Sequence, residues 1–234
     1  MTGTLYGLGV GPGDPELITV KALRILRAVP VIAYPATEDG LSMARNIVAP
    51  HLDGNQTEFA IRIPIHVGPE PSAAVYDAAA ATISEHLEAG RDVAVLCEGD
   101  PFFYGSFVYL FARLSERFPV RVVPGISSLT ACAAELGAPL AARNDVLAIL
   151  PAPLDSTILM ARLAEVDAAA IIKLGRHAGR IVKLLGELGL TERCRYIERA
   201  TMANQRILPL TALDAADVPY FSIILMHRRG EAWT

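Results

Sequence analysis

The fold is decided in the stretch VAVLCEGDPFFYG, which spans residues 93–105. Its first part, Val93 to Leu96, is an apolar run that is typical of a buried strand. Residues 106–114 are typical of a helix, so the Gly99-Asp100-Pro101 turn stands where a strand ends and a helix begins. In an open α/β sheet, ligands bind outside the carboxyl ends of the strands. The stretch therefore indicates an α/β protein with a ligand site at this turn.

Composition and charge narrow the classes of function. The 234 residues suffice for one large domain or two small ones, and a content of 52% hydrophobic residues argues against disorder. The net charge is −4 and no block of Lys and Arg occurs, so nothing marks a nucleic-acid-binding protein. No uncharged apolar run reaches the ~18 residues of a membrane span, and residues 1–13 lack the features of a signal peptide. We therefore expect neither a nucleic-acid nor a membrane partner.

The cysteines and histidines predict neither disulfides nor a metal site. Cys97, Cys132 and Cys194 are odd in number and far apart, which favours free thiols in a reducing cytoplasm. The histidines are scattered, and no residues have the spacing of metal ligands. No serine elbow, Walker loop or plausible order of a Ser/His/Asp triad occurs. We expect a cytoplasmic protein without a metal, in which the residues alone identify no catalytic group.

Strand-like and helix-like segments alternate in the first half of the chain. The expected strands cover residues 4–9, 31–34, 58–63, 93–96 and 120–123. One expected helix begins at Asp14-Pro15-Glu16, and the others cover residues 42–49, 72–89 and 106–114. This alternation predicts parallel βαβ units, and thus an α/β domain with a mainly parallel sheet over residues 1–124.

The second half of the chain is less regular. Clear helices are expected over residues 127–136 and 181–188, each ended by a glycine. The expected strands cover residues 145–150, 168–174, 195–198, 205–208 and 220–227. Several strands with few helices predict a second α/β domain over residues 125–234, with a mixed sheet. No repeat or low-complexity linker separates the halves, so we expect two closely joined domains.

Three turns that follow expected strands have both a structural and a functional interpretation. The segment GLGVGPGD (7–14) lacks the third glycine of a dinucleotide fingerprint because position 14 is Asp, which argues against a nicotinamide site and leaves a tight turn with a helix cap. The segment EGDP (98–101) is either a β-turn before core aromatic residues or a set of acceptors for a cationic or hydroxyl-bearing ligand. The serines of PGISS (124–128) either cap a helix or bind a ligand carboxylate.

Basic residues follow two expected strands of the second half. The segment KLGRH (173–177) stands after one of them, and ERAT (198–201) stands after another, with Arg206 nearby. These groups could pair with the carboxylates of a substrate. Equally, they could be solvated or could form ordinary salt bridges. The residues alone leave both interpretations open.

Taken in order, these segments resemble the signatures of the tetrapyrrole methylases, the S-adenosylmethionine-dependent family that builds siroheme and cobalamin. Residues 9–19 match the first signature, residues 98–105 the second and residues 124–128 the third. The resemblance covers nearly the whole chain. It implies two α/β domains of the tetrapyrrole methylase type, with the methyl donor S-adenosylmethionine in the cleft between them, and a homodimer.

Within the family, the likeness is closest to members that methylate precorrin-2 at carbon 20. The segments that carry it are residues 98–107, 146–154, 172–177, 198–202 and 219–222. This likeness implies that the acceptor is precorrin-2, a reduced macrocycle with many carboxylates, and that the products are precorrin-3A and S-adenosylhomocysteine.

The resemblance also implies positions for the binding residues. By motif position, the donor is contacted by Pro12, Glu98, Gly99, Asp100, Phe103, Ser127, Ser128, Leu174 and Ala200. The candidates for pairing with acceptor carboxylates are Arg62, Arg143, Lys173, Arg176, Arg199 and Arg206. Members that methylate uroporphyrinogen carry an acidic residue at the end of the second strand. Pro35 stands at that place here, so the resemblance assigns no proton acceptor.

Several other functions stay open at the level of sequence. The acceptor could be cobalt-factor II, the cobalt-bearing counterpart of precorrin-2, or the methyl group could go to another ring carbon or to diphthine on a protein. A different class is a nucleotide-dependent oxidoreductase, which the incomplete glycine pattern disfavours. A third class is a binding module that holds the donor without transferring its methyl group.

Overall fold

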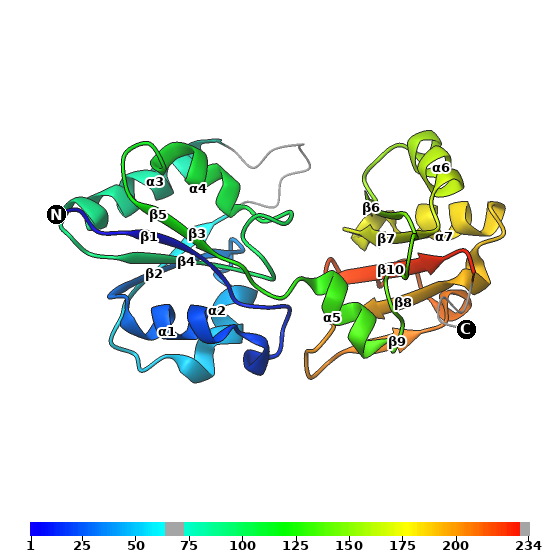
Figure 1. Cartoon of the computed structure of the whole chain (residues 1–234), viewed down its shortest axis with the longest axis horizontal. Coiled ribbons are helices and arrows are strands. Elements are labelled where there is room, and N and C mark those ends of the chain that lie inside the picture. The colour runs from blue at the N-terminus through cyan, green and yellow to red at the C-terminus, as the bar shows by residue number, and fades with distance from the viewer. Residues whose placement is uncertain (64–72, 230–234) are drawn as a thin grey trace. The chain divides into compact units, whose positions relative to one another are not determined.

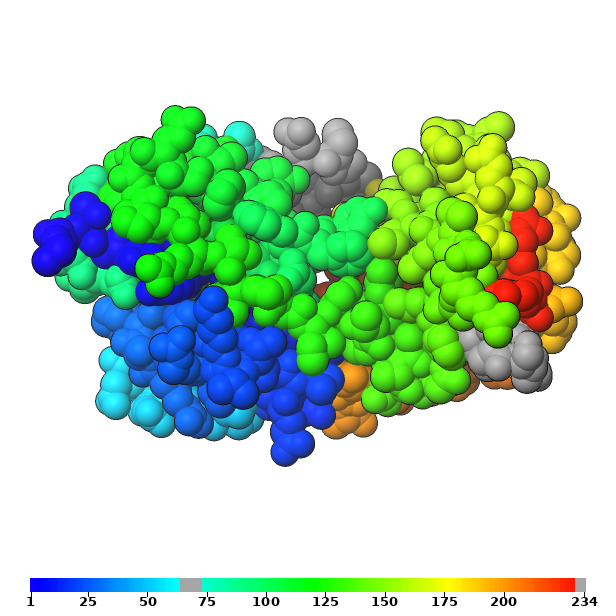
Figure 2. All heavy atoms as spheres, viewed as in Figure 1, coloured from blue at the N-terminus to red at the C-terminus, as the bar shows by residue number. Residues whose placement is uncertain are grey.

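The computed structural model describes residues 1–63 and 73–229. It divides into two compact units, Met1–Ser127 and Ser128–Thr234. Figure 2 shows their atoms coloured by residue number, from blue to green for the first unit and from green to red for the second.

The first unit is built on a five-stranded sheet in which every neighbouring pair of strands is parallel (Figure 1). In spatial order the strands are β3 (Thr57–Arg62), β2 (Val31–Ala36), β4 (Val93–Cys97), β1 (Leu5–Gly9) and β5 (Val120–Val123). The predicted α/β class and the parallel sheet are confirmed. Because all five strands run the same way, their carboxyl ends meet at one edge.

Helices cover both faces of this sheet. Successive side chains of β4 point to opposite faces, and this explains why the sequence of the strand is apolar throughout. Val93 and Val95 join a core cluster with α3 (Ala73–Glu88) and α4 (Phe107–Leu114). Ala94 and Leu96 join a second cluster with α1 (Val20–Ala28) and α2 (Met43–Val48). A strand that is buried on both faces needs an unbroken apolar run.

The first helix begins later than the sequence predicts. Asp14 does act as a cap, but it accepts from the Glu16 N–H at 2.8 Å and begins only the 3₁₀ turn η1 (Pro15–Leu17). The backbone then returns to an extended conformation at Ile18, and the Thr19 hydroxyl caps α1 by accepting from the Ala22 N–H at 3.2 Å. The predicted helix start at Asp14 is therefore wrong for α1.

The other helices of the first unit follow the prediction within a residue or two. The predicted helix 72–89 corresponds to α3, with Ser72 outside the described residues. A second 3₁₀ turn, η2 (Ala49–His51), follows α2.

The second unit contains a mixed five-stranded sheet, as predicted. In spatial order its strands are β6 (Leu147–Pro151), β7 (Ala168–Ile172), β10 (Ser222–His227), β8 (Cys194–Glu198) and β9 (Arg206–Leu208). β6 and β7 are parallel, and the remaining pairs are antiparallel. Because β7 and β8 both run opposite to β10, their carboxyl ends flank the residue where β10 begins.

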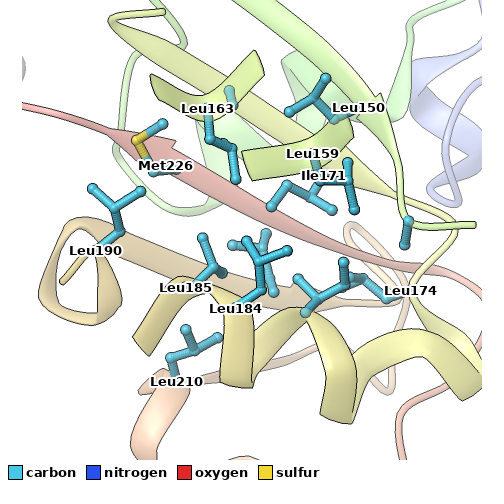
Figure 3. Close-up of a cluster of buried hydrophobic side chains, with 14 of the residues drawn as sticks. Leu150, Leu159, Leu163, Ile171, Leu174, Leu184, Leu185, Leu190, Leu210 and Met226 are labelled. Atoms are coloured by element: carbon cyan, nitrogen blue, oxygen red, sulfur yellow. The ribbon is translucent and has the colours of Figure 1, made fainter. Parts of the chain in front are cut away.

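Two helices pack on this sheet to form one core (Figure 3). Leu159 and Leu163 of α6 (Ser156–Glu165) and Leu184 and Leu185 of α7 (Ala178–Glu187) enter the same cluster as Met226 of β10. Helix α5 (Ser128–Glu135) contacts β10. The sequence analysis does not predict α6. The short turns are η3 (Gly175–His177), η4 (Thr191–Arg193) and η5 (Leu210–Ala212).

None of the helices in the described part of the chain has the length and apolar character that crossing a membrane requires.

Candidate functional site

The turns after β1 and β4 touch through their backbones at the carboxyl edge of the first sheet. The Gly99 N–H donates to the Gly11 carbonyl oxygen at 2.8 Å, and the Gly11 N–H donates to the Gly99 carbonyl oxygen at 3.4 Å. Gly11 and Gly99 have φ values of 85° and 63°, a region in which a side chain brings strain. Glycine adopts this conformation without that strain at both positions.

The segment after β5 joins the same contact. A Cβ on Gly125 would overlap the Gly99 carbonyl oxygen and would lie 2.8 Å from the Gly9 Cα. A Cβ on Gly9 would lie 2.7 Å from the Gly99 carbonyl oxygen. The glycines of the three sequence signatures therefore pack directly against one another and leave no room for side chains between them.

The Asp100 carboxylate ties two of these segments together. Its Oδ1 accepts from the Phe102 N–H at 2.9 Å, which orders the turn that Asp100 itself begins. Its Oδ2 accepts from the Gly125 N–H at 3.1 Å. One carboxylate thus fixes both the turn after β4 and the segment after β5.

Glu98, the first residue after β4, directs a second carboxylate to this edge. Its Oε1 accepts from the Ala44 N–H in the first turn of α2 at 3.2 Å. Burial raises the pKa of the Glu98 carboxyl, and the hydrogen bonds from backbone N–H groups partly oppose that rise. Pro12, which directly follows Gly11 on the segment after β1, is buried.

Aromatic rings follow the same turn. Phe103 and Tyr104 meet edge to face with ring centroids 5.1 Å apart, and Phe102 meets Phe111 of α4 in the same way at 5.1 Å. Phe102 and Tyr104 are about half exposed. Tyr104 has a positive φ of 54°, which costs a non-glycine residue free energy and is commonest at functional sites. Apolar surface therefore lies beside the two carboxylates.

The predicted donor contacts divide between the two units. Six of them, Pro12, Glu98, Gly99, Asp100, Phe103 and Ser127, lie on the segments that follow β1, β4 and β5. In the second unit, Leu174 and Ala200 are buried directly beyond β7 and β8, and Ser128 is the exposed first residue of α5. The structure thus places all but Ser128 beyond the carboxyl ends of strands, and their contacts to the donor stay predictions.

Unusual backbone conformations mark the corresponding edge of the second sheet. Lys173 after β7 has a φ of 59°, and Arg199 and Thr201 after β8 have φ values of 50° and 67°. The Arg199 N–H donates to the Phe221 carbonyl oxygen at 2.8 Å, which ties the end of β8 to the residue before β10. Strained residues of this kind persist only where the surroundings hold them.

The six predicted basic residues have different environments. Arg199 and Arg206 converge on one carboxylate, that of Glu198. Arg62 donates to the Glu38 carbonyl oxygen at 2.7 Å, and Arg176 contacts the His177 ring at 3.4 Å. Arg143 is exposed and Lys173 is half-buried. Among the contacts of the described residues, Arg199 and Arg206 are therefore the two that share a partner, Glu198.

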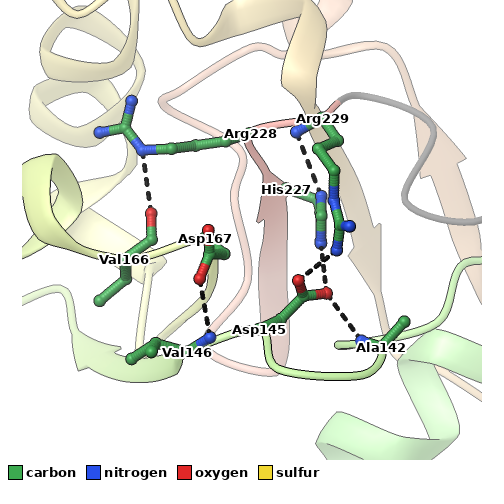
Figure 4. A network of polar contacts seen from close by, with 8 residues as sticks. All are labelled: Ala142, Asp145, Val146, Val166, Asp167, His227, Arg228 and Arg229. Carbon is green, nitrogen blue, oxygen red and sulfur yellow. Dashed lines mark hydrogen bonds and ion pairs between the residues drawn. The ribbon is translucent and has the colours of Figure 1, made fainter.

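A second polar network, which the sequence analysis did not predict, lies at the opposite end of β10 (Figure 4). The Asp145 carboxylate accepts from the Ala142 N–H at 2.7 Å, contacts the His227 ring at 3.1 Å and pairs with Arg229. The backbone hydrogen bond and the cationic neighbours lower the pKa of Asp145. This network links the segment before β6 to the end of β10.

The thiols and the acidic groups offer no covalent or metal chemistry within the described residues. Burial raises the pKa of Cys132 and Cys194 to about 12 each, and it raises the pKa of Cys97 well above the usual range. Thiols with such pKa values are poor nucleophiles at neutral pH. In the described ranges, no three His, Cys, Asp or Glu side chains are grouped to hold a metal ion.

The fold and the site together define a class: an α/β ligand-binding protein whose parallel sheet gathers three glycine turns and two carboxylates at its carboxyl edge. The chain belongs to the tetrapyrrole (corrin/porphyrin) methylases, whose family model matches residues 4–216.

Individual relatives extend this assignment. Cobalamin biosynthesis protein CobIJ of Mycobacterium tuberculosis is 43% identical over 96% of this chain, and the chain spans only about half of that relative, 46% of its length. Precorrin-2 C(20)-methyltransferase of a Sinorhizobium species is 39% identical, over 96% of this chain and 95% of its own. Cobalt-precorrin-2 C(20)-methyltransferase of Salmonella typhimurium is 32% identical, over 99% of each chain.

Among solved structures, uroporphyrin-III C-methyl transferase from Thermus thermophilus, complexed with S-adenosylhomocysteine, is similar to this chain. It superimposes with a TM-score of 0.69 at 25% identity, over 96% of this chain and 92% of its own.

Proposed function

We propose that the protein is an S-adenosylmethionine-dependent methyltransferase of cobalamin biosynthesis, which methylates precorrin-2 at carbon 20 to give precorrin-3A and S-adenosylhomocysteine. The observation that carries this proposal is the direct contact of Gly9, Gly99 and Gly125, which builds one site from the three family signatures. The likeness to the Sinorhizobium precorrin-2 C(20)-methyltransferase over nearly the whole of both chains supports the choice of acceptor.

The residues of this edge fit the methyl donor. S-adenosylmethionine carries a positive sulfonium, a positive ammonium and ribose hydroxyls. Carboxylates attract the two cations and accept hydrogen bonds from the ammonium and the hydroxyls. Glu98 and Asp100 supply carboxylates, and Phe103 supplies an aromatic ring. The side-chain-free contact of the glycines lets a ligand approach the backbone closely. We propose these residues as donor contacts, together with Pro12, Ser127, Ser128, Leu174 and Ala200.

The reaction needs orientation more than it needs a covalent intermediate. An electron-rich bridging carbon of the acceptor attacks the sulfonium methyl group in line, the carbon–sulfur bond breaks, and S-adenosylhomocysteine leaves with the electron pair. The methylated carbon then loses its proton. The protein holds the carbon and the methyl group at attacking distance, which can supply several kcal/mol. The raised thiol pKa values agree with a mechanism in which Cys97 and Cys132 take no part.

Two other functions are tested against this one. The likeness to the Salmonella protein favours a cobalt-bearing acceptor as the second candidate. A nicotinamide-dependent oxidoreductase would need a glycine at position 14, where Asp14 instead caps a 3₁₀ turn.

The deciding experiment is anaerobic incubation with S-adenosylmethionine that carries a labelled methyl group. Precorrin-2 and cobalt-factor II are supplied in parallel tubes, and NADH binding is titrated separately. We expect the label at carbon 20 of precorrin-2. Label only in the cobalt-bearing macrocycle would move the enzyme to the other branch of the pathway. No transfer to either acceptor would refute the proposed reaction.

The assembly and the location are part of the proposal. The family resemblance supports a homodimer, which light scattering on the purified protein tests. The three free thiols support a reducing cytoplasm as the compartment.

A further inference from the structure

A buried carboxylate lies at the carboxyl end of β8. The side chain of Glu198 is only 1% exposed. Its Oε1 accepts from Arg199 Nη1 at 2.7 Å and forms an ion pair with Arg206 Nε at 3.2 Å, and its Oε2 accepts from the Tyr196 hydroxyl. A buried carboxylate is costly unless it is paired in this way. Glu198 is therefore fully engaged by three side chains of its own unit.

The sheet itself sets these positions. Arg206 on β9 stands directly opposite Glu198 on β8, so their side chains lie on the same face. Tyr196 is two residues earlier on β8 and shares that face. Burial, and then the hydrogen bond to Glu198, raises the pKa of Tyr196, so its hydroxyl stays a donor. The carboxylate is held by regular strands rather than by loops.

The charges of this cluster do not cancel. Two guanidinium groups face one carboxylate. Among the described residues, the other carboxylate that pairs with them is that of Asp217, which is exposed, lies 3.8 Å from Arg206 and is screened by water. Arg199 is 32% exposed and Arg206 is 49% exposed. The arginines therefore reach solvent with donors that Glu198 does not use, and the cluster keeps positive charge.

Hydrogen bonds order the loop beyond β8 and tie its first residue to the segment before β10, which carries two aromatic residues. The Thr201 N–H donates to Gln205 Oε1 at 2.6 Å, which closes the loop between β8 and β9. The Arg199 N–H is bonded to the Phe221 carbonyl oxygen. Phe221 and Tyr220 meet edge to face at 5.2 Å, and both rings are exposed. The cationic pair and the two rings thus belong to segments that meet at one edge of the second sheet.

We propose that Glu198 is a positioning residue that holds Arg199 and Arg206 as a binding pair for carboxylates of the acceptor, with Tyr220 and Phe221 as the apolar surface for the adjoining ring. A flat macrocycle with carboxylate side chains presents both kinds of group. The identity of that acceptor rests on the function proposed above.

The variant Glu198→Gln tests the proposal because two explanations predict opposite changes in the affinity for the acceptor. Removal of the negative charge makes the cluster more positive, so a site that acts through charge alone would bind an anionic acceptor more tightly. If Glu198 positions the arginines, the acceptor instead binds more weakly in Glu198→Gln, by about tenfold or more, because misplaced groups lose much of their effect. The affinity for S-adenosylhomocysteine stays unchanged.

The matched control is Asp145→Asn. Asp145 is also a nearly buried carboxylate, held by an arginine and a histidine of the same unit, but it lies at the opposite end of β10. Both variants lose a buried ion-pair network, so both lower the melting temperature. Only Glu198→Gln should weaken acceptor binding. If Glu198→Gln does not fold, Arg206→Met, at a half-exposed position, tests the arginine's part of the proposal: acceptor binding should weaken, and unchanged binding would overturn it.

The measurements are anaerobic calorimetry of precorrin-2 binding in the presence of S-adenosylhomocysteine, and the KM and kcat of methyl transfer. We expect a raised Kd and KM for precorrin-2 with little change in kcat. Equal or tighter binding by Glu198→Gln, or equal weakening in Asp145→Asn, would overturn the proposal. If the unchanged protein binds precorrin-2 but does not methylate it, the proposed function fails while the binding comparison still decides the role of Glu198. If it does not bind precorrin-2, both proposals fail.

Discussion

Asp100 shows how one side chain organises the first sheet's edge. Its two carboxylate oxygens accept from two backbone N–H groups, those of Phe102 and Gly125, which belong to segments that follow different strands. Hydrogen bonds to a charged acceptor are stronger than neutral ones. The position therefore needs an acceptor at both oxygens, which only a carboxylate provides.

Asp100→Asn is expected to weaken binding of S-adenosylmethionine about tenfold and to leave the fold intact. The amide keeps one acceptor and turns a donor toward the other N–H group, and a hydrogen bond to a charged group contributes about 1.5–3 kcal/mol. Calorimetry with the donor measures the affinity, and circular dichroism checks the fold. Asp155→Asn, which alters a carboxylate that caps α6, is the control and should bind the donor normally. Unchanged affinity in Asp100→Asn would remove its role at the donor site.

Helix α6 shows what sequence periodicity misses at the level of an element. Its buried residues are Leu159 and Leu163, but Ile158 and Met160 are apolar and exposed. Apolar residues on both faces blur the helical pattern on which prediction depends. The remaining local signal is the Asp155 cap, which accepts from the Thr157 N–H at 2.9 Å.

The strands were easier to predict than the contacts between them. Strands such as β4 and β7 are buried throughout, so their apolar runs identify them directly. The glycine turns were identified as signatures, yet only the fold shows that Gly9, Gly99 and Gly125 touch. The pairing of Glu198 with Arg206 was left open because partners on different strands leave no trace in local spacing.

Leu159→Ala is expected to reduce the free energy of unfolding by about 2–5 kcal/mol, because it leaves a cavity in the core beneath α6. Ile158→Ala, the neighbouring control at an exposed position, should change it by no more than about 0.5 kcal/mol. Urea unfolding followed by circular dichroism measures both. Equal effects in the two variants would contradict the orientation of α6 on the sheet.

The free energy of unfolding of the whole molecule depends on pH through Asp145. The folded state lowers the pKa of Asp145 from its ordinary value of 3.8, through hydrogen bonds from the Ala142 N–H and the His227 ring and through the charge of Arg229. A carboxyl with a lowered pKa stabilises the folded state fully above its unfolded pKa. That contribution disappears as the pH falls below 3.8 and through the lower pKa of the folded state.

Accordingly, the difference in unfolding free energy between the unchanged protein and Asp145→Asn should be largest at neutral pH and should shrink at pH values below 3.8. Urea unfolding at a series of pH values gives this difference directly. A difference that stays constant into the acid range would mean that Asp145 contributes through shape and not through its charge.

The strand order of the first sheet has a consequence for synthesis of the chain. β1 is made first, but its only neighbours are β4 and β5, which begin at Val93 and Val120. On the ribosome, this apolar strand emerges with both edges unpaired, and the second edge stays unpaired until β5 has been translated. Pairing across such a separation is slow and exposes the nascent chain to aggregation. The contact of Gly9, Gly99 and Gly125 can therefore form only after the last of these three glycines has left the tunnel.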